Sequence, residues 1–217
     1  MLGYHFTNGV LRGGGAIPPI GEWLVHEGEI KPGESGLPAC ETVLGALADA
    51  NGASLHRVEL DGDLMPASDK RPGNWTGRRR RVLWTLDATG VLQAFGRWCA
   101  SEVVDQWDAP AVARDWLASG DPALLDETWR AAWSASRYAG LLADEIGAWS
   151  AVRGAMWSAA RSASRSAAEA ASAYLDGYAV SSAVRAAARF GGRHSSRAAQ
   201  GERLAAMVED AMASKEL

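Results

Sequence analysis

Residues 55–60, LHRVEL, have the alternation of a β-strand, with Leu55, Arg57 and Glu59 on one face and the residues between them on the other. Residues 82–87, VLWTLD, predict a second strand, which we expect to pair with the first. The aromatic and β-branched stretch LGYHFT at 2–7 predicts a strand at the start of the chain, and residues 22–26 predict another. The first part of the chain should therefore contain a small sheet of about four strands.

A short helix is predicted between these strands. Apolar residues at helical spacing occur within 41–50, and Asn51-Gly52 follows with residues that tolerate a left-handed helix end. The sequence KPGESGLP at 31–38 is typical of turns, and residues 61–77 are expected to form a loop.

After Val91 the apolar residues recur with the 3.6-residue period of an α-helix. Asp108 with Pro110 predicts the start of a further helix to Leu117, and Asp121-Pro122 repeats this signal. One face of the helix that starts near Val91 should carry Leu92, Phe95, Cys99, Val103 and Trp107.

Small side chains dominate the region that follows. Residues 123–190 contain 22 alanines and no proline. Alanine loses no side-chain entropy in a helix, so nearly every position here favours helix. We predict a hairpin or bundle of helices, or one long helix that dimerises.

Together these patterns predict an α+β protein. A small mixed or antiparallel sheet forms the head, residues 1–107, and the Ala-rich helical region occupies residues 108–217. Gly140, Gly147 and Gly154 recur every seven residues in that region, which would place them on one face and permit close helix contact. They are equally consistent with weak points of a helix.

The composition indicates the cellular compartment of the protein more than its function. The formal net charge is −4, which argues against a general nucleic-acid coat protein. The only cysteines, Cys40 and Cys99, form no CxxC pair, so we expect a reducing compartment, no structural metal and no cofactor. Without an apolar leader or an 18-residue apolar stretch, the chain is expected to be cytoplasmic and not bound to a membrane.

The clearest anion-binding pattern is RPGNWTGRRRR. Guanidinium groups bind phosphate in pairs, and Trp75 could stack on a base. Strand alternation would send Arg79 and Arg81 to one face and Arg78 and Arg80 to the other. A charged edge strand that resists aggregation explains the same residues.

A second pattern suggests ribose chemistry. Tyr4 and His5 lie on the first strand, as does a ribose-binding histidine in ADP-ribosyltransferase-like folds, and Glu59 could supply the glutamate of such a site. In the alternative interpretation, His5 is an ordinary strand histidine and Glu59 faces solvent. No GxSxG, HExxH or GxxxxGK[ST] motif occurs.

Arginines also recur every four residues near the end of the Ala-rich region. Arg185 and Arg189 begin a helical stripe that could meet phosphates or an acidic partner. Such a row is more often a solvated face.

The order of GYHFT, LRGG with IPPIGE, GLPAC, LHRVELDG, RRVLW, LQAFGRWCA and ERLAAMVEDA resembles an uncharacterised protein family of bacteriophages and bacteria. Members of that family carry a GLHAS-like stretch where this chain has GLPAC, so Pro38 replaces a histidine. The resemblance brings no activity with it, but it implies a phage or mobile-element context.

Three functions follow as hypotheses. The first is a phage accessory protein that binds a nucleotide or nucleotide-derived signal, as a counter-defence factor would, through Tyr4, His5, Trp75, Arg79 and Arg81. The second is a protein-interaction or oligomerisation module built on the Ala-rich helices. The third is an ADP-ribosyltransferase-like enzyme.

Overall fold

The computed structural model describes residues 1–11, 14–67, 72–101, 109–124, 126–128, 130–131, 134 and 197–215. These residues form an α+β structure with two compact units. The first unit contains Met1–Gly90 and the last helix from Leu204 onward, and the second begins at Val91. The predicted boundary between residues 107 and 108 lies outside the described residues.

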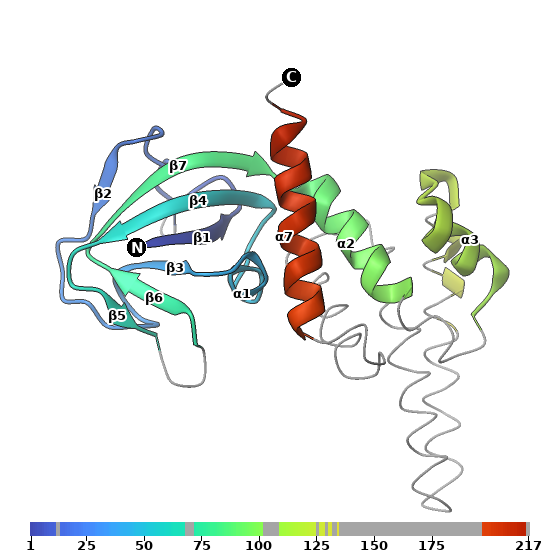
Figure 1. The fold of residues 1–217 in the computed structure, drawn as a ribbon, viewed down its shortest axis with the longest axis horizontal. Coiled ribbons are helices and arrows are strands. Elements are labelled where there is room, and N and C mark those ends of the chain that lie inside the picture. The colour runs from blue at the N-terminus through green and yellow to red at the C-terminus, as the bar shows by residue number, and fades with distance from the viewer. Residues whose placement is uncertain are drawn as a thin grey trace, which may run out of the picture. The chain divides into compact units, whose positions relative to one another are not determined.

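The first unit is built on a seven-stranded antiparallel sheet with the order β2-β7-β4-β1-β3-β6-β5 (Figure 1). The strands are β1 Leu2–Thr7, β2 Trp23–Val25, β3 Leu37–Cys40, β4 Ser54–Asp61, β5 Met65–Pro66, β6 Asn74–Gly77 and β7 Arg79–Asp87.

The chain path requires this sheet to curl. Only Arg78 separates β6 from β7 in the sequence, yet β4, β1 and β3 lie between these two strands in the sheet. The two halves of the sheet therefore meet where β6 passes into β7. At this corner the Arg78 N–H donates to Gly62 O at 2.8 Å.

The sheet buries one face of strand β4 almost completely, and Leu55 on the other face of this strand is buried as well. His56, Val58 and Leu60 of β4 are buried, whereas the alternating residues Arg57 and Glu59 are half-buried. This alternation is the strand period of two, and it persists although the pairing with β7 shifts register between Arg57 and Val58. A hydrophobic cluster on the buried face combines Ala39, Val58, Leu60 and Val82.

Four of the strands follow the sequence prediction. The strands at 2–7, 55–60 and 82–87 are confirmed, as is the pairing of the last two, and residues 22–26 contain β2. The prediction of turns throughout 31–38 and of a loop throughout 61–77 was wrong, because β3, β5 and β6 lie there. These three strands are two to four residues long, and cross-strand pairing rather than an alternating sequence defines them.

The first helix is shorter than predicted. Helix α1 is Val43–Leu47, and the Thr42 side chain caps it by accepting from the Gly45 N–H. It ends at Ala48 in a right-handed conformation, so the predicted left-handed cap at Asn51-Gly52 was wrong. A Cβ on Gly52 would lie 2.5 Å from Thr7 O, so close approach to β1 is what requires glycine here.

The other helices within the described residues are α2 Thr89–Ser101, α3 Ala111–Ser119, the 3₁₀ helix η2 Pro122–Leu124 and α7 Arg197–Ala213. On α2 the predicted face is confirmed for Leu92, Phe95 and Cys99, all buried. Pro110 rather than Asp108 occupies the N-cap of α3, without a side-chain bond. Asp121 does cap the next turn, accepting from the Ala123 N–H at 2.9 Å.

Most of the Ala-rich region lies outside the described residues. Gly140, Gly147, Gly154, Arg185 and Arg189 all fall there, so the predicted helix contacts and the arginine stripe stay predictions. Among the helices that are described, none combines the length and the apolar character needed to cross a membrane.

Candidate ligand-binding cavity

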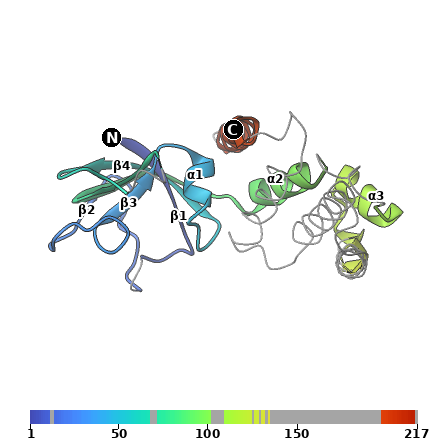
Figure 2. The ribbon, with the colours of Figure 1, turned by 90° about the horizontal axis from the view of Figure 1, so that it is seen from below.

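A cavity of about 640 Å³ lies within the first unit. Strand β1 contributes His5 and Thr7, β6 contributes Trp75, and β7 contributes Arg80; the turn at 33–36 forms another part of the wall. Helix α1 packs against β1 and β3 at the edge of this region (Figure 2). Cavities of this volume commonly hold small organic ligands.

Arg80 is the unusual residue of this cavity. It is 6% exposed, and its Nη1 donates to Pro38 O at 2.7 Å. Among the described residues, no carboxylate lies within ion-pair distance of its guanidinium group. Burial lowers the pKa of Arg80 to about 10, so the group is still protonated at neutral pH. A buried charge that is not paired is costly, which makes this position exceptional.

The three neighbouring arginines show the contrast. Arg78 pairs with Asp63, Arg79 with Asp61 and Arg81 with Glu59. These three side chains are between 36% and 47% exposed, whereas Arg80 is enclosed.

Strand alternation separates Arg79 and Arg81 from Arg80 as the sequence predicts, whereas Arg78 precedes β7 and is not part of this alternation. The guanidinium groups of Arg79 and Arg81 lie 5.2 Å and 4.8 Å from the ring of Trp23, on the face of the sheet opposite Arg80. Neither residue lines the cavity. Of the ligand-binding residues proposed from the sequence, the cavity therefore brings together Tyr4, His5 and Trp75 but not the two arginines.

Two histidines lie side by side at the cavity, His5 in its wall and His56 next to it. His5 on β1 pairs directly with His56 on β4, so their side chains share one face. The two ring nitrogens of His56 lie 2.9 Å from the hydroxyl oxygens of Thr7 and Thr85.

Both imidazoles are uncharged at neutral pH. Burial, with the nearby positive charge of Arg80, lowers the pKa of His56 to about 4 and holds the pKa of His5 well below its usual value. His5 therefore offers a neutral polar group to the cavity, and Arg80 provides its positive charge.

Glu59 does not join this group. Its neighbours along β4 place it on the opposite face from His56 and hence from His5, and its Oε2 accepts from Arg81 Nε at 2.7 Å. The structure does not assemble the His5 and Glu59 pair that a ribose-processing site would use.

Two aromatic residues at the cavity, Trp75 and Tyr4, have different contacts. Trp75 is half-buried, packs against the hydrophobic cluster and donates from Nε1 to Glu41 Oε1 at 2.7 Å. The ring of Tyr4 lies 4.3 Å from the guanidinium carbon of Arg57 and meets Trp84 edge-on. Both rings contact protein groups, and both residues line the cavity.

The part of the chain that the structure describes contains no assembled set of metal ligands. No group of three or more His, Cys, Asp or Glu side chains there is arranged to hold an ion. Arg80 presents several N–H donors together with a positive charge to the cavity, and Glu34 and Asp49 are the carboxyl residues among those that line it.

No protein-family model, curated protein or solved structure matches the chain. The phage context and the family resemblance therefore stay predictions.

Arg80 is the residue that sequence reasoning missed. Alternation correctly placed Arg80 on the face opposite Arg79 and Arg81, but it did not indicate which face would be enclosed, and it did not apply to Arg78, which precedes β7. The curl of the sheet decides that point, and it encloses the face of Arg80.

Proposed function

We propose that the protein binds a small phosphate-bearing ligand of the nucleotide class in this cavity. The observation that supports the proposal is Arg80, a buried cation without a carboxylate partner among the described residues, at the wall of a cavity of about 640 Å³. A bound phosphate would supply the missing counter-charge and accept several hydrogen bonds.

The position of Trp75 supports a ligand with an aromatic ring. Arg80 bonds to the carbonyl of Pro38, and the next residue, Ala39, pairs with Trp75 across β3 and β6. With strands about 4.8 Å apart, the guanidinium group and the backbone of Trp75 lie within about 10 Å. A mononucleotide spans that separation, with its phosphate at Arg80 and its base at Trp75.

Sequestration of a nucleotide signal would need no catalytic group, which agrees with the separation of His5 from Glu59. A phage counter-defence factor of this kind would use the cavity to hold its ligand rather than to transform it. The neutral imidazole of His5 would serve as a hydrogen-bond partner for the sugar.

The test is a thermal-shift and calorimetric screen of the full chain against AMP, cyclic mononucleotides, NAD and ADP-ribose. A ligand at about 100 times its dissociation constant should stabilise the fold by about 2.7 kcal/mol, which shifts the melting temperature by several degrees. Arg80→Met should abolish the shift, and Arg79→Met, which removes an exposed arginine next to it, should not.

Two outcomes would contradict the proposal. One is the absence of a shift with every nucleotide. The other is a shift that Arg80→Met retains in full while Arg79→Met removes it, because the site would then lie on the opposite face of the sheet.

A further inference from the structure

One wall of the cavity is formed by a loop, and a residue outside this loop holds it in place through hydrogen bonds. Residues 26–36, the cavity loop, connect β2 to β3, and they line the cavity through His26 and the turn at 33–36. The turn is closed by the Ser35 N–H donating to Lys31 O at 2.8 Å, and Ser35 Oγ donates to Glu29 O at 2.6 Å.

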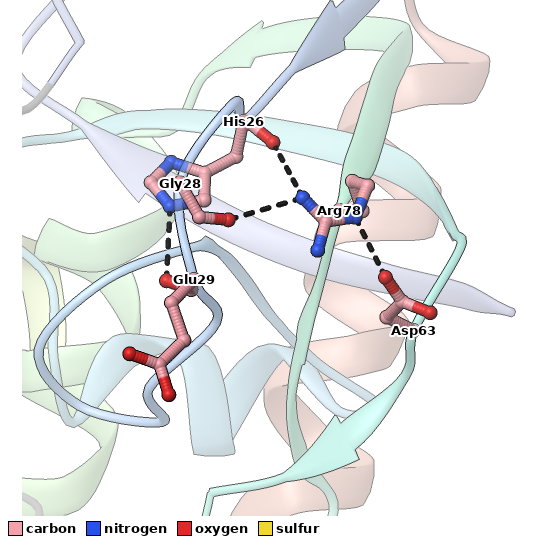
Figure 3. Close-up of polar contacts among 5 residues, drawn as sticks. All are labelled: His26, Gly28, Glu29, Asp63 and Arg78. Carbon is pink, nitrogen blue, oxygen red and sulfur yellow. Dashed lines mark hydrogen bonds and ion pairs between the residues drawn. The ribbon is translucent and has the colours of Figure 1, made fainter.

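Arg78 holds the start of this loop from the corner between β6 and β7. Its Nη1 donates to the carbonyls of His26, at 3.1 Å, and Gly28, at 3.0 Å, while its Nε donates to Asp63 Oδ2 at 2.6 Å (Figure 3). The main chain reinforces the contact, because the His26 N–H donates to Arg78 O at 2.9 Å. One guanidinium group thus joins the cavity loop to the loop that carries Asp63.

The backbone at Asp63 indicates that this arrangement is specific. Asp63 has a φ of 46°, in the left-handed region, where a residue other than glycine carries about 1 kcal/mol of strain or more. Its carboxylate is thereby held against Arg78. The Ile30 side chain, 8% exposed, anchors the middle of the loop in the interior.

We infer that Arg78 is a positioning residue for the ligand, which fixes the cavity loop as a wall without itself lining the cavity. This inference rests on the proposed function. When Arg78 is removed, the loop should open locally more often, and a ligand held by Arg80 should escape faster. Arg78 and Arg80 thus have separate tasks, although one residue lies between them.

The experiment combines hydrogen exchange with calorimetry on the full chain, with AMP as the probe. In Arg78→Met, amides of residues 26–36 should exchange faster in the absence of AMP, and the affinity for AMP should fall about tenfold, mostly through faster release. Asp63→Asn loosens the same contact without shortening Arg78, so smaller changes in the same direction are expected. Arg79→Met is the matched control and should change neither quantity.

The inference is overturned if Arg78→Met and Asp63→Asn leave the exchange of residues 26–36 unchanged, or accelerate it no more than that of the whole sheet. Faster loop exchange with unaltered AMP affinity and release also overturns it, because Arg78 would then have a structural role only. If the wild-type protein binds no AMP or other nucleotide, the proposed function fails. The exchange data would still show whether Arg78 fastens the loop.

Discussion

Arg78 to Arg81 show how neighbouring residues of one type acquire different roles. Three of them face outward or lie at a corner and pair with Asp61, Asp63 or Glu59, where an exposed ion pair contributes little to stability. Arg80 is enclosed, so its charge loses most of its hydration. The hydrogen bond to Pro38 O compensates for part of that loss, and a bound anion would compensate for more.

The cost of enclosing Arg80 should be measurable in the ligand-free protein. A buried charge that is not paired costs free energy, so an apolar side chain of similar length in its place removes that cost. We therefore expect Arg80→Met to leave the free energy of unfolding in urea unchanged or to raise it, while nucleotide binding is lost. This combination is typical of a residue retained for function.

A loss of more than about 2 kcal/mol in Arg80→Met would contradict this prediction. It would mean that the hydrogen bond to Pro38 O and the packing of the side chain stabilise the sheet. Arg80→Lys, which keeps the charge, separates the two contributions.

At the scale of elements, close approach of the backbone limits α1 more than helix propensity does. The chain leaves α1 after Leu47 and crosses the end of β1, where Gly52 lies against Thr7 and Asn8. A side chain at Gly52 would meet backbone atoms that cannot move independently of the sheet.

A comparison of two glycine-to-alanine substitutions tests this explanation. Gly52→Ala should lower the free energy of unfolding by about 1–3 kcal/mol, because its Cβ would come within 2.5 Å of the backbone of β1 and Asn8. Gly90→Ala, exposed in the first turn of α2 with nothing within 4 Å, should raise it by about 0.5–1 kcal/mol. Urea unfolding measures both, and equal effects would argue against close approach as the reason for Gly52.

The short strands β3, β5 and β6 belong to this scale too. They contain Pro38, Pro66, Asn74 and Gly77, residues that favour turns in the sequence. They are strands because they pair with neighbouring strands, and the local sequence contains no pattern that predicts this pairing.

For the whole molecule, the neutral histidines make the stability of the sheet depend on pH. The folded-state pKa of His56 is about 4, below the unfolded value near 6.5, and the pKa of His5 is also lowered. The unfolded chain therefore binds more protons than the folded one in this range, and stability is lost as pH falls through it.

We expect the free energy of unfolding to be constant above about pH 7 and to fall between pH 6.5 and 4.5, by up to about 1.4 kcal/mol per pH unit for each histidine. Urea titrations across this range measure the slope, and His56→Gln should reduce it. The pKa of Asp61 is lowered by hydrogen bonds from the Gly62 N–H and from Arg79, and the pKa of Asp87 by hydrogen bonds from Thr89, so both lose their contributions only at lower pH. A flat profile from pH 7 to 4.5 would show that the histidines are not held neutral by the fold.

The sequence by itself determined what depends on neighbours along the chain. It predicted the longer strands, the apolar face of Leu92, Phe95 and Cys99, and the placement of Arg79 and Arg81 on one side, because strand and helix periods alone govern these features. It also brought forward His5 and Trp75 as ligand-binding residues, and both line the cavity.

Only the tertiary structure decided which face is enclosed. Curling of the sheet, with β6 meeting β7 at Arg78, places Arg80 inside and leaves Arg79 and Arg81 outside. The pairing register of β1 with β4 places His5 beside His56 and so on the face opposite Glu59. Strand alternation divides the side chains between two faces, but it does not indicate which of the two faces will be enclosed. The difference arises from long-range pairing and the burial of apolar area, and these depend on segments that are distant in the sequence.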